Sequence, residues 1–155
     1  KIGIDPHLTM TEPELSDDEL SEQVKLADVV VDCTDNFHTR FALNRACVGA
    51  QVPLVSGAAI RAEGQLSVFD PARGTPCYQC LFPEAPAPGL APSCAEAGVL
   101  GPLPGVVGAM MAVETVKLIA GAGQPLLGEM LIYDALWGET RKIGLKRREG
   151  CPVCG

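Results

Sequence analysis

The 155 residues are enough for one domain that buries most of its apolar surface, so no metal ion is needed merely to hold a miniature fold together. Hydrophobic residues make up 47% of the chain and the formal net charge is −7, which argues against nucleic acid as the main partner. No stretch has the pattern of a secretion signal, and seven cysteines, four of them in metal-like spacing, fit a reducing cytoplasm.

The first predicted helix begins after Ser16. Ser16 can cap this helix and Glu19 can reach back as its capping-box partner, with Leu15 and Leu20 at the hydrophobic staple positions. We expect an amphipathic helix that runs to about Leu26.

A strand, a helix and a second strand follow. Residues 29–31 are three valines, a β-branched run typical of a strand buried on both faces of a parallel sheet. Residues 37–48 carry apolar side chains at nearly four-residue spacing, which predicts a helix, and residues 53–56 predict another short buried strand. This order is the βαβ unit of a doubly wound α/β fold.

The second half of the chain predicts a hairpin, a long helix and two last strands. Residues 58–61 and 65–69 would pair around a turn at Glu63 and Gly64. Residues 106–120 predict a buried helix that is apolar nearly all round, in a region shorter than the ~20 residues of a membrane span. Residues 130–133 and 140–145 predict the strands, with the basic side chain of Lys142 on the solvated face of an edge strand.

Four cysteines form two C-x-x-C pairs, Cys77 with Cys80 and Cys151 with Cys154. Two such pairs suit the four tetrahedral positions of a structural zinc ion and leave none for a substrate. A redox C-x-x-C or two disulfides are the alternatives, but a thioredoxin-type motif would occur once. The favoured interpretation is a zinc ion that pins the C-terminus to the middle of the chain.

Asp32 and Asp35 follow the first predicted strand, at the carboxyl end where ligands of open α/β sheets bind. A carboxylate there can hold Mg²⁺ against nucleotide phosphates. Asp35 can equally cap the next helix, and the spacing alone does not separate these two roles. Arg40 and Asn44 lie four residues apart on that helix and can face the same crevice, although a solvated pair is the default interpretation.

Cys94 lies in the proline-rich connection, outside the paired cysteines, and is the best candidate nucleophile. No histidine lies near Cys94 in the sequence to act as its base. Cys33 and Cys47 are predicted to be small buried hydrophobic residues. The chain contains no glycine-rich loop of the kinds that cradle phosphates.

In their order and spacing, these motifs closely resemble the E1-like activating enzymes of the MoeB/ThiF family. The residues that carry the resemblance are Asp32-Cys33-Thr34-Asp35-Asn36 with Arg40 and Asn44, residues 53–60, Gly64-Gln65, the two C-x-x-C pairs, and residues 94–99. The resemblance runs from about His7 to the last residue. It implies the C-terminal part of a Rossmann-like E1 fold with a mixed sheet and a four-cysteine zinc site.

The resemblance also implies an activity. Family members use Mg-ATP to adenylate the C-terminal glycine of a ubiquitin-like sulfur-carrier protein, for molybdopterin or thiamin synthesis, and they form homodimers. Carried over by position, Asp35 would bind the magnesium ion and the phosphates, with Asn36, Arg40 and Asn44 lining the nucleotide crevice. Cys94 matches a loop cysteine that takes the activated carboxyl or sulfur in some members.

The chain departs from the family at its start, where members carry the glycine-rich βαβ half that holds ATP. It begins at Lys1 as if in mid-domain, so we expect residues 1–155 to be one domain, the C-terminal part of a longer adenylation domain. ATP binding would need that preceding part. The alternative is a zinc-stabilised module that binds a ubiquitin-like partner without catalysis, and a thiol redox protein is a third interpretation. No nucleic acid or membrane partner is expected.

Overall fold

The structure, a computed structural model, describes residues 15–87 and 94–155. Its centre is a five-stranded mixed sheet in the order β1-β2-β3-β4-β5. β1 and β2 are parallel, and all the other neighbouring strands are antiparallel. The strands are β1 (Val30–Asp32), β2 (Leu54–Ile60), β3 (Glu63–Phe69), β4 (Glu129–Asp134) and β5 (Glu139–Gly144). The expected α/β class with a mixed sheet is confirmed.

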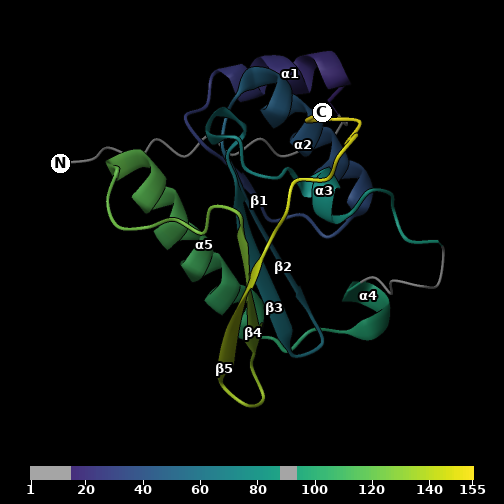
Figure 1. Ribbon diagram of the computed structural model, residues 1–155. Coiled ribbons are helices and arrows are strands. Elements are labelled where there is room, and N and C mark those ends of the chain that lie inside the picture. Colours follow the sequence, from purple (N-terminus) through teal and green to yellow (C-terminus); the bar gives the residue numbers. More distant parts are fainter. Residues whose placement is uncertain (1–14, 88–93) are drawn as a thin grey trace.

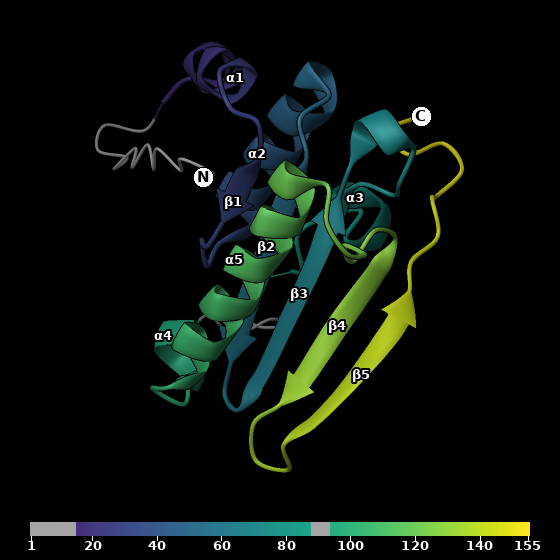
Figure 2. The same ribbon diagram turned by 90° about the vertical axis from the view of Figure 1, so that its left-hand side faces the viewer.

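Helices cover both faces of the sheet (Figures 1 and 2). They are α1 (Asp17–Lys25), α2 (Phe37–Ala50), α3 (Tyr78–Leu81), α4 (Cys94–Ala97) and α5 (Leu103–Ala120), with a 3-10 turn at Pro71–Arg73. On one face, side chains of α1, α2 and α3 pack around Leu54 and Phe69. On the other face, α5 packs against Val55, Leu66 and Val68. Adjacent residues of β2 therefore belong to two separate cores, as the alternation of side chains along a strand requires.

The capping box of α1 forms as predicted. The Ser16 N–H donates to Oε2 of Glu19 at 2.9 Å, and the Glu19 N–H donates to Oγ of Ser16 at 3.3 Å. Each side chain satisfies a backbone donor that the first helical turn would otherwise leave unpaired. Val24 then buries the inner side of α1 against α2.

The predicted hairpin is confirmed, but the predicted position of its turn is wrong, as is the prediction that the valine run is buried on both faces. β1 forms one edge of the sheet within the described residues, and Val31 is 43% exposed, so the valine run is not buried on both faces. β2 is one continuous strand, and the hairpin turns at Arg61 and Ala62 instead of Glu63 and Gly64. Arg61 takes a positive φ of 53°, a conformation more usual for glycine, which hid this turn in the sequence.

Helix α5 starts at Leu103, earlier than predicted, because Pro104 lies in the first turn, where a missing N–H costs nothing. Its close approach to the sheet depends on strand glycines: a Cβ at Gly64 would lie 2.6 Å from Cγ2 of Val107. The helix is not buried all round, since its outer side exposes apolar residues such as Val113, which is 55% exposed. By length and composition alone α5 could cross a membrane, but a core helix passes the same test, and α5 packs on β2 and β3.

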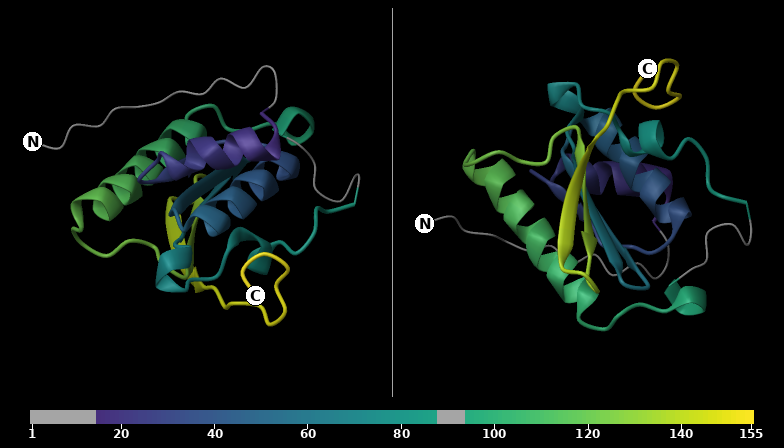
Figure 3. Two further views of the ribbon diagram at one scale, coloured as in Figure 1. Left: turned by 90° about the horizontal axis from the view of Figure 1, so that it is seen from above. Right: turned by 60° about the horizontal axis from the view of Figure 1, so that its bottom comes forward.

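After β5, the C-terminal segment (yellow) runs on beyond the end of the strand to α3 (Figures 1 and 3). After β5, the backbone passes Leu145, which packs into the core around α2, and reaches buried Cys151. The hairpin between β4 and β5 extends the other way, and its tip exposes Leu136 and Trp137. All of β5 is exposed, which confirms the predicted edge strand with Lys142 on it.

Candidate functional site

Asp32 lies at the carboxyl end of β1 and is only 1% exposed. Its Oδ1 accepts hydrogen bonds from the N–H and the hydroxyl of Thr34 at 2.9 and 2.7 Å. Its Oδ2 accepts the hydroxyl of Ser56, on the neighbouring strand, at 3.2 Å and lies 4.0 Å from Nε of Arg40. Both carboxylate oxygens are engaged inside the protein, so Asp32 shapes the loop.

Arg40 continues this network from the first half of α2. Its Nε donates to the carbonyl of Thr34 at 3.1 Å, a second donor on Nη2 reaches the same oxygen, and Nη1 donates to the hydroxyl of Tyr78 at 3.4 Å. Nη2 also reaches the carbonyl of Gly57 at 3.4 Å. The side chain is buried, as is that of Asn44, so the default interpretation of a solvated pair is wrong.

Asp35 is exposed at the end of the same loop. Among the described residues, no hydrogen bond or ion pair engages its carboxylate. The cap of α2 is Asn36, whose Oδ1 accepts the Thr39 N–H at 2.8 Å, so the interpretation of Asp35 as that cap is wrong. Asp35 therefore offers free oxygen ligands at the sheet end where ligands of α/β folds bind.

The four paired cysteines meet in one cluster, with all their sulfur atoms within 4.8 Å of one another. The Sγ atoms of Cys77 and Cys80 are 4.0 Å apart, those of Cys77 and Cys151 are 3.7 Å apart, and those of Cys80 and Cys154 are 3.4 Å apart. Four thiolates at about 2.3 Å from a tetrahedral metal ion would be roughly 3.8 Å apart. The cluster is thus compatible with a metal site, and the described cysteines are free thiols.

Asn44 connects α2 to this cluster. Its Nδ2 donates to Sγ of Cys77 at 3.7 Å, and its Oδ1 accepts the backbone N–H of Tyr78 at 2.8 Å. Tyr78 is the first residue of α3, so Asn44 supplies an acceptor to a helix whose N-cap, Cys77, makes no side-chain cap bond.

The protonation of the cluster is uneven. Burial raises the pKa of Cys77 to about 12, opposed by the hydrogen bond from Asn44. Burial acts in the same direction on Cys151, but backbone hydrogen bonds from Cys154 and Val153 and contacts with the other sulfur atoms outweigh it and lower its pKa to about 7. A metal ion that binds all four thiolates must therefore displace protons.

The remaining cysteines divide. Cys47 is buried as predicted, whereas Cys33 is exposed at the end of β1, which contradicts the prediction of a buried residue. Burial and the nearby Asp32 carboxylate raise the pKa of Cys33. Cys94 is the first residue of α4, and its side chain lies outside the described part of the structure.

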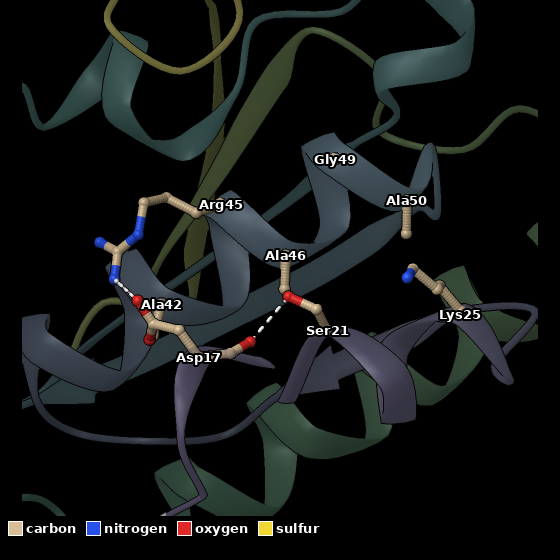
Figure 4. A pocket seen from close by; sticks show the side chains of 8 residues that line it. All are labelled: Asp17, Ser21, Lys25, Ala42, Arg45, Ala46, Gly49 and Ala50. Atoms are coloured by element: carbon tan, nitrogen blue, oxygen red, sulfur yellow. Dashed lines mark hydrogen bonds and ion pairs between the residues drawn. The ribbon is translucent and has the colours of Figure 1, made fainter. Parts of the chain in front are cut away.

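An open groove lies elsewhere, between α1 and α2, with a volume of about 310 Å³ (Figure 4). Small residues of α2 leave this space, and Arg45 forms an ion pair with Asp17 across one end of it at 3.4 Å. The residues that line it are Asp17, Ser21, Lys25, Ala42, Arg45, Ala46, Gly49 and Ala50. None of the predicted site residues lies among them. Arg40 lines a much narrower crevice with Ser56 and Gly57 on the sheet.

The structure therefore brings the predicted residues together in two groups, the loop with Asp35, Asn36 and Arg40, and the cysteine cluster with Asn44. Sequence reasoning missed Tyr78, which contacts both groups through its N–H and its hydroxyl. Its position next to the first cysteine was the only available signal. Ser56 was also missed, because the pairing of Ser56 with Asp32 in the sheet is a tertiary feature.

The geometry first defines a class: a Rossmann-like α/β domain with a mixed sheet and a four-cysteine cluster that joins its C-terminus to its middle. The sequence model of the ThiF family matches residues 1–153, and the chain belongs to this family. A sulfur carrier protein adenylyltransferase from Thermus thermophilus is 48% identical over a 145-residue alignment that covers 91% of this chain and 54% of that protein.

Two Escherichia coli proteins are also similar. Molybdopterin-synthase adenylyltransferase is 46% identical over 98% of this chain and 61% of its own length. Sulfur carrier protein ThiS adenylyltransferase is 41% identical over 100% of this chain and 61% of its own length. The chain thus spans a little over half the length of the curated relatives it matches. The crystal structure of E. coli MccB with ATP has the same fold, with a TM-score of 0.71, 21% identity, and coverage of 96% of this chain and 44% of MccB.

Proposed function

We propose that this chain is the C-terminal part of an ATP-dependent adenylyltransferase that activates the C-terminal glycine of a ubiquitin-like sulfur-carrier protein. Membership of the ThiF family and 41–48% identity to adenylyltransferases of sulfur carriers support this activity. The structural observation that carries the proposal is the exposed carboxylate of Asp35, three residues after the carboxyl end of β1, which no side chain or backbone group of the described residues engages. The chain covers 54–61% of the length of these relatives, and in this proposal the rest of the nucleotide site comes from residues outside the chain described here.

In this proposal Asp35 provides oxygen ligands for a magnesium ion that neutralises the triphosphate of ATP. Asn36, whose Oδ1 is used for capping, keeps its amide donors for the crevice. Arg40 holds the loop by its bonds to the Thr34 carbonyl and is positioned beside the crevice. Asn44 is the fourth residue predicted to line the nucleotide crevice. It lies behind the loop, where its side chain contacts Cys77 of the cysteine cluster.

The proposed ion in the cysteine cluster is zinc, held by Cys77, Cys80, Cys151 and Cys154. A four-thiolate site is closed, so the ion would stabilise the fold and would not contact the substrate. The support is that three sulfur separations, 3.4, 3.7 and 4.0 Å, are close to the roughly 3.8 Å of a tetrahedral site. Thiol titration of the native full-length protein, before and after chelation, tests the assignment. An unchanged count of free thiols would exclude thiolate ligation.

Cys94 is the proposed acceptor of the activated acyl group, if this protein forms a covalent intermediate as some family members do. Its sulfur would attack the carbonyl carbon of the acyl adenylate, forming a thioester as the bond to the phosphate oxygen breaks and AMP and a proton leave. Adenylation itself does not require this step. A Cys94→Ala variant should therefore keep pyrophosphate exchange and lose the thioester.

Pyrophosphate exchange that depends on a sulfur carrier tests the adenylation proposal in the full-length protein. Replacing Asp35 with Asn should lower the exchange rate by roughly 100-fold or more, the scale seen when one charge-stabilising group is removed from an active site. Asp28→Asn is the matched control, since Asp28 is also exposed and precedes the same strand. Normal exchange in Asp35→Asn would contradict the assignment of Asp35.

The alternative function is a module that binds a ubiquitin-like protein without catalysis. The exposed Trp137 and Leu136 at the tip of the β4 to β5 hairpin favour it, because exposed aromatic residues often anchor protein interfaces. Carrier binding without any exchange activity in the full-length protein would favour the module.

We also propose that the protein forms a homodimer. The mass of the native protein in solution tests this proposal.

A further inference from the structure

Asn44 occupies an unusual position for a residue predicted to line the nucleotide crevice. It is 1% exposed and belongs to α2, yet both ends of its side-chain amide point to the start of α3. Nδ2 donates to Sγ of Cys77 at 3.7 Å and Oδ1 accepts the N–H of Tyr78 at 2.8 Å. The two residues it contacts are 33 and 34 positions away in the sequence.

The orientation of the amide follows from its partners. A backbone N–H can only donate, so the atom that faces Tyr78 must be the oxygen. The nitrogen then faces the sulfur of Cys77, and a metal-bound thiolate is a good acceptor for it. A flipped amide would set donor against donor on one side and an oxygen against a thiolate on the other.

A second contact lies one turn earlier on the same helix. Nη1 of Arg40 donates to the hydroxyl of Tyr78 at 3.4 Å, while the rest of the guanidinium holds the carbonyl of Thr34. Thr34 directly precedes Asp35. The loop with the free carboxylate and the first cysteine pair are therefore attached to one face of α2, through Arg40 and Asn44 respectively.

We propose that Asn44 is a positioning residue for the metal centre: it orients the Cys77 thiolate and, with Arg40 and Tyr78, couples metal occupancy to the order of the Asp32–Asn36 loop. This inference rests on the proposed metal site. Outer-shell hydrogen bonds of this kind fix ligand orientation, and their loss typically costs about 10- to 100-fold in metal affinity.

Cobalt substitution of the full-length protein tests the first part. The thiolate-to-cobalt absorption band reports directly on the sulfur ligands, and release of the ion to a chelator reports on affinity. Asn44→Leu, which removes both hydrogen bonds, should shift the band and release the ion about 10- to 100-fold faster. Asn44→Asp keeps the shape and the acceptor but loses the donor, and it should show a similar change.

Thr115→Val is the control. The hydroxyl of Thr115 donates to the Met111 carbonyl at 2.9 Å, so this variant also loses one hydrogen bond, but on α5, which packs on the other face of the sheet from α2 and α3. It should leave the band and the release rate as in the wild type. A wild-type band and release rate in both Asn44 variants would overturn the inference, whereas a wild-type protein that binds no metal ion would refute the metal site itself.

The coupling can be tested in the wild type, without relying on the folding of a variant. Backbone hydrogen exchange is measured before and after chelation. Chelation should increase the exchange rate at residues 32–39 more than along α5, which packs on the other face of the sheet. An equal rise at both places would indicate general loosening and would overturn the coupling. Unchanged exchange at residues 32–39 would overturn it as well.

Discussion

The cysteine cluster and the Asp35 loop both contact α2, but they differ in how their polar groups are buried and hydrogen-bonded. In the cluster, the thiols of Cys77 and Cys151 are buried and the amide of Asn44 is bonded at both ends. In the loop, Asp32 is fully engaged while Asp35, three residues later, is exposed and free of partners among the described residues. The buried, bonded groups therefore stabilise the fold, whereas the carboxylate of Asp35 is available to bind a ligand.

The largest effect on stability should come from the cluster. Cys77→Ser removes one of the four proposed metal ligands and should lower the free energy of unfolding of the full-length protein by about 3 to 6 kcal/mol, less than the ~10–16 kcal/mol of zinc peptides whose whole fold depends on the ion. The two apolar cores on either side of the sheet would remain. Urea unfolding with zinc in excess measures the loss.

Cys33→Ser is the control for this prediction, because Cys33 is an exposed cysteine outside the cluster. It should change the free energy of unfolding by no more than about 0.5 kcal/mol. Equal effects of the two substitutions would show that the cluster adds no stability.

Asp32 should come next. Asp32→Ala leaves the buried guanidinium of Arg40 without its nearest carboxylate and the hydroxyl of Ser56 without its acceptor. Breaking one partner of a buried charge pair typically costs about 3 kcal/mol or more, which guanidinium chloride unfolding would measure. In the double variant with Arg40→Leu, the loss should be smaller than the sum of the two single losses. Strict additivity would mean that the two side chains do not interact.

Local patterns made much of this structure predictable. The capping box at Ser16 and Glu19 and the spacing of the two C-x-x-C pairs each depend on residues within one turn or motif, so the sequence contains the whole signal. Strand order was less accessible. The three valines of residues 29–31 have the composition of a central strand, but β1 forms an edge of the described sheet.

The contacts that join the two groups of site residues were beyond such patterns. Asn44 and Cys77 are far apart in sequence, and a polar residue four positions after Arg40 on a helix usually faces solvent. Only the packing of α3 on α2 reveals that the side chains of Arg40 and Asn44 are buried. Arg40 donates to the hydroxyl of Tyr78, and Asn44 contacts the Tyr78 N–H and the sulfur of Cys77. The side chain of Cys94 lies outside the described residues, so its role stays a prediction.

A smaller effect should appear as a pH dependence at Cys47. Burial, followed by the charge of Asp32, raises the pKa of this thiol from 9.0 to about 12. The folded state then holds the proton more tightly than the unfolded state, so this stabilisation is complete below about pH 9 and is lost as the pH rises towards 12. Relative to Cys47→Ala, the unfolding free energy of the wild type should fall by about 1 to 2 kcal/mol between pH 8.5 and pH 10.5. A constant difference would exclude the thiol as its source.

The smallest effect on stability should be that of Asp35→Asn, even though its effect on exchange activity should be large. Asp35 is exposed and has no partner in the part of the chain that the structure describes, so the free energy of unfolding should stay within about 0.5 kcal/mol of the wild type in urea. Asp32→Asn provides the contrast three residues away, because it should lower stability by weakening the contacts to Thr34 and Arg40. If Asp35→Asn destabilised the protein as much as Asp32→Asn, Asp35 would belong to the scaffold, and the loop would have no carboxylate left to hold a magnesium ion.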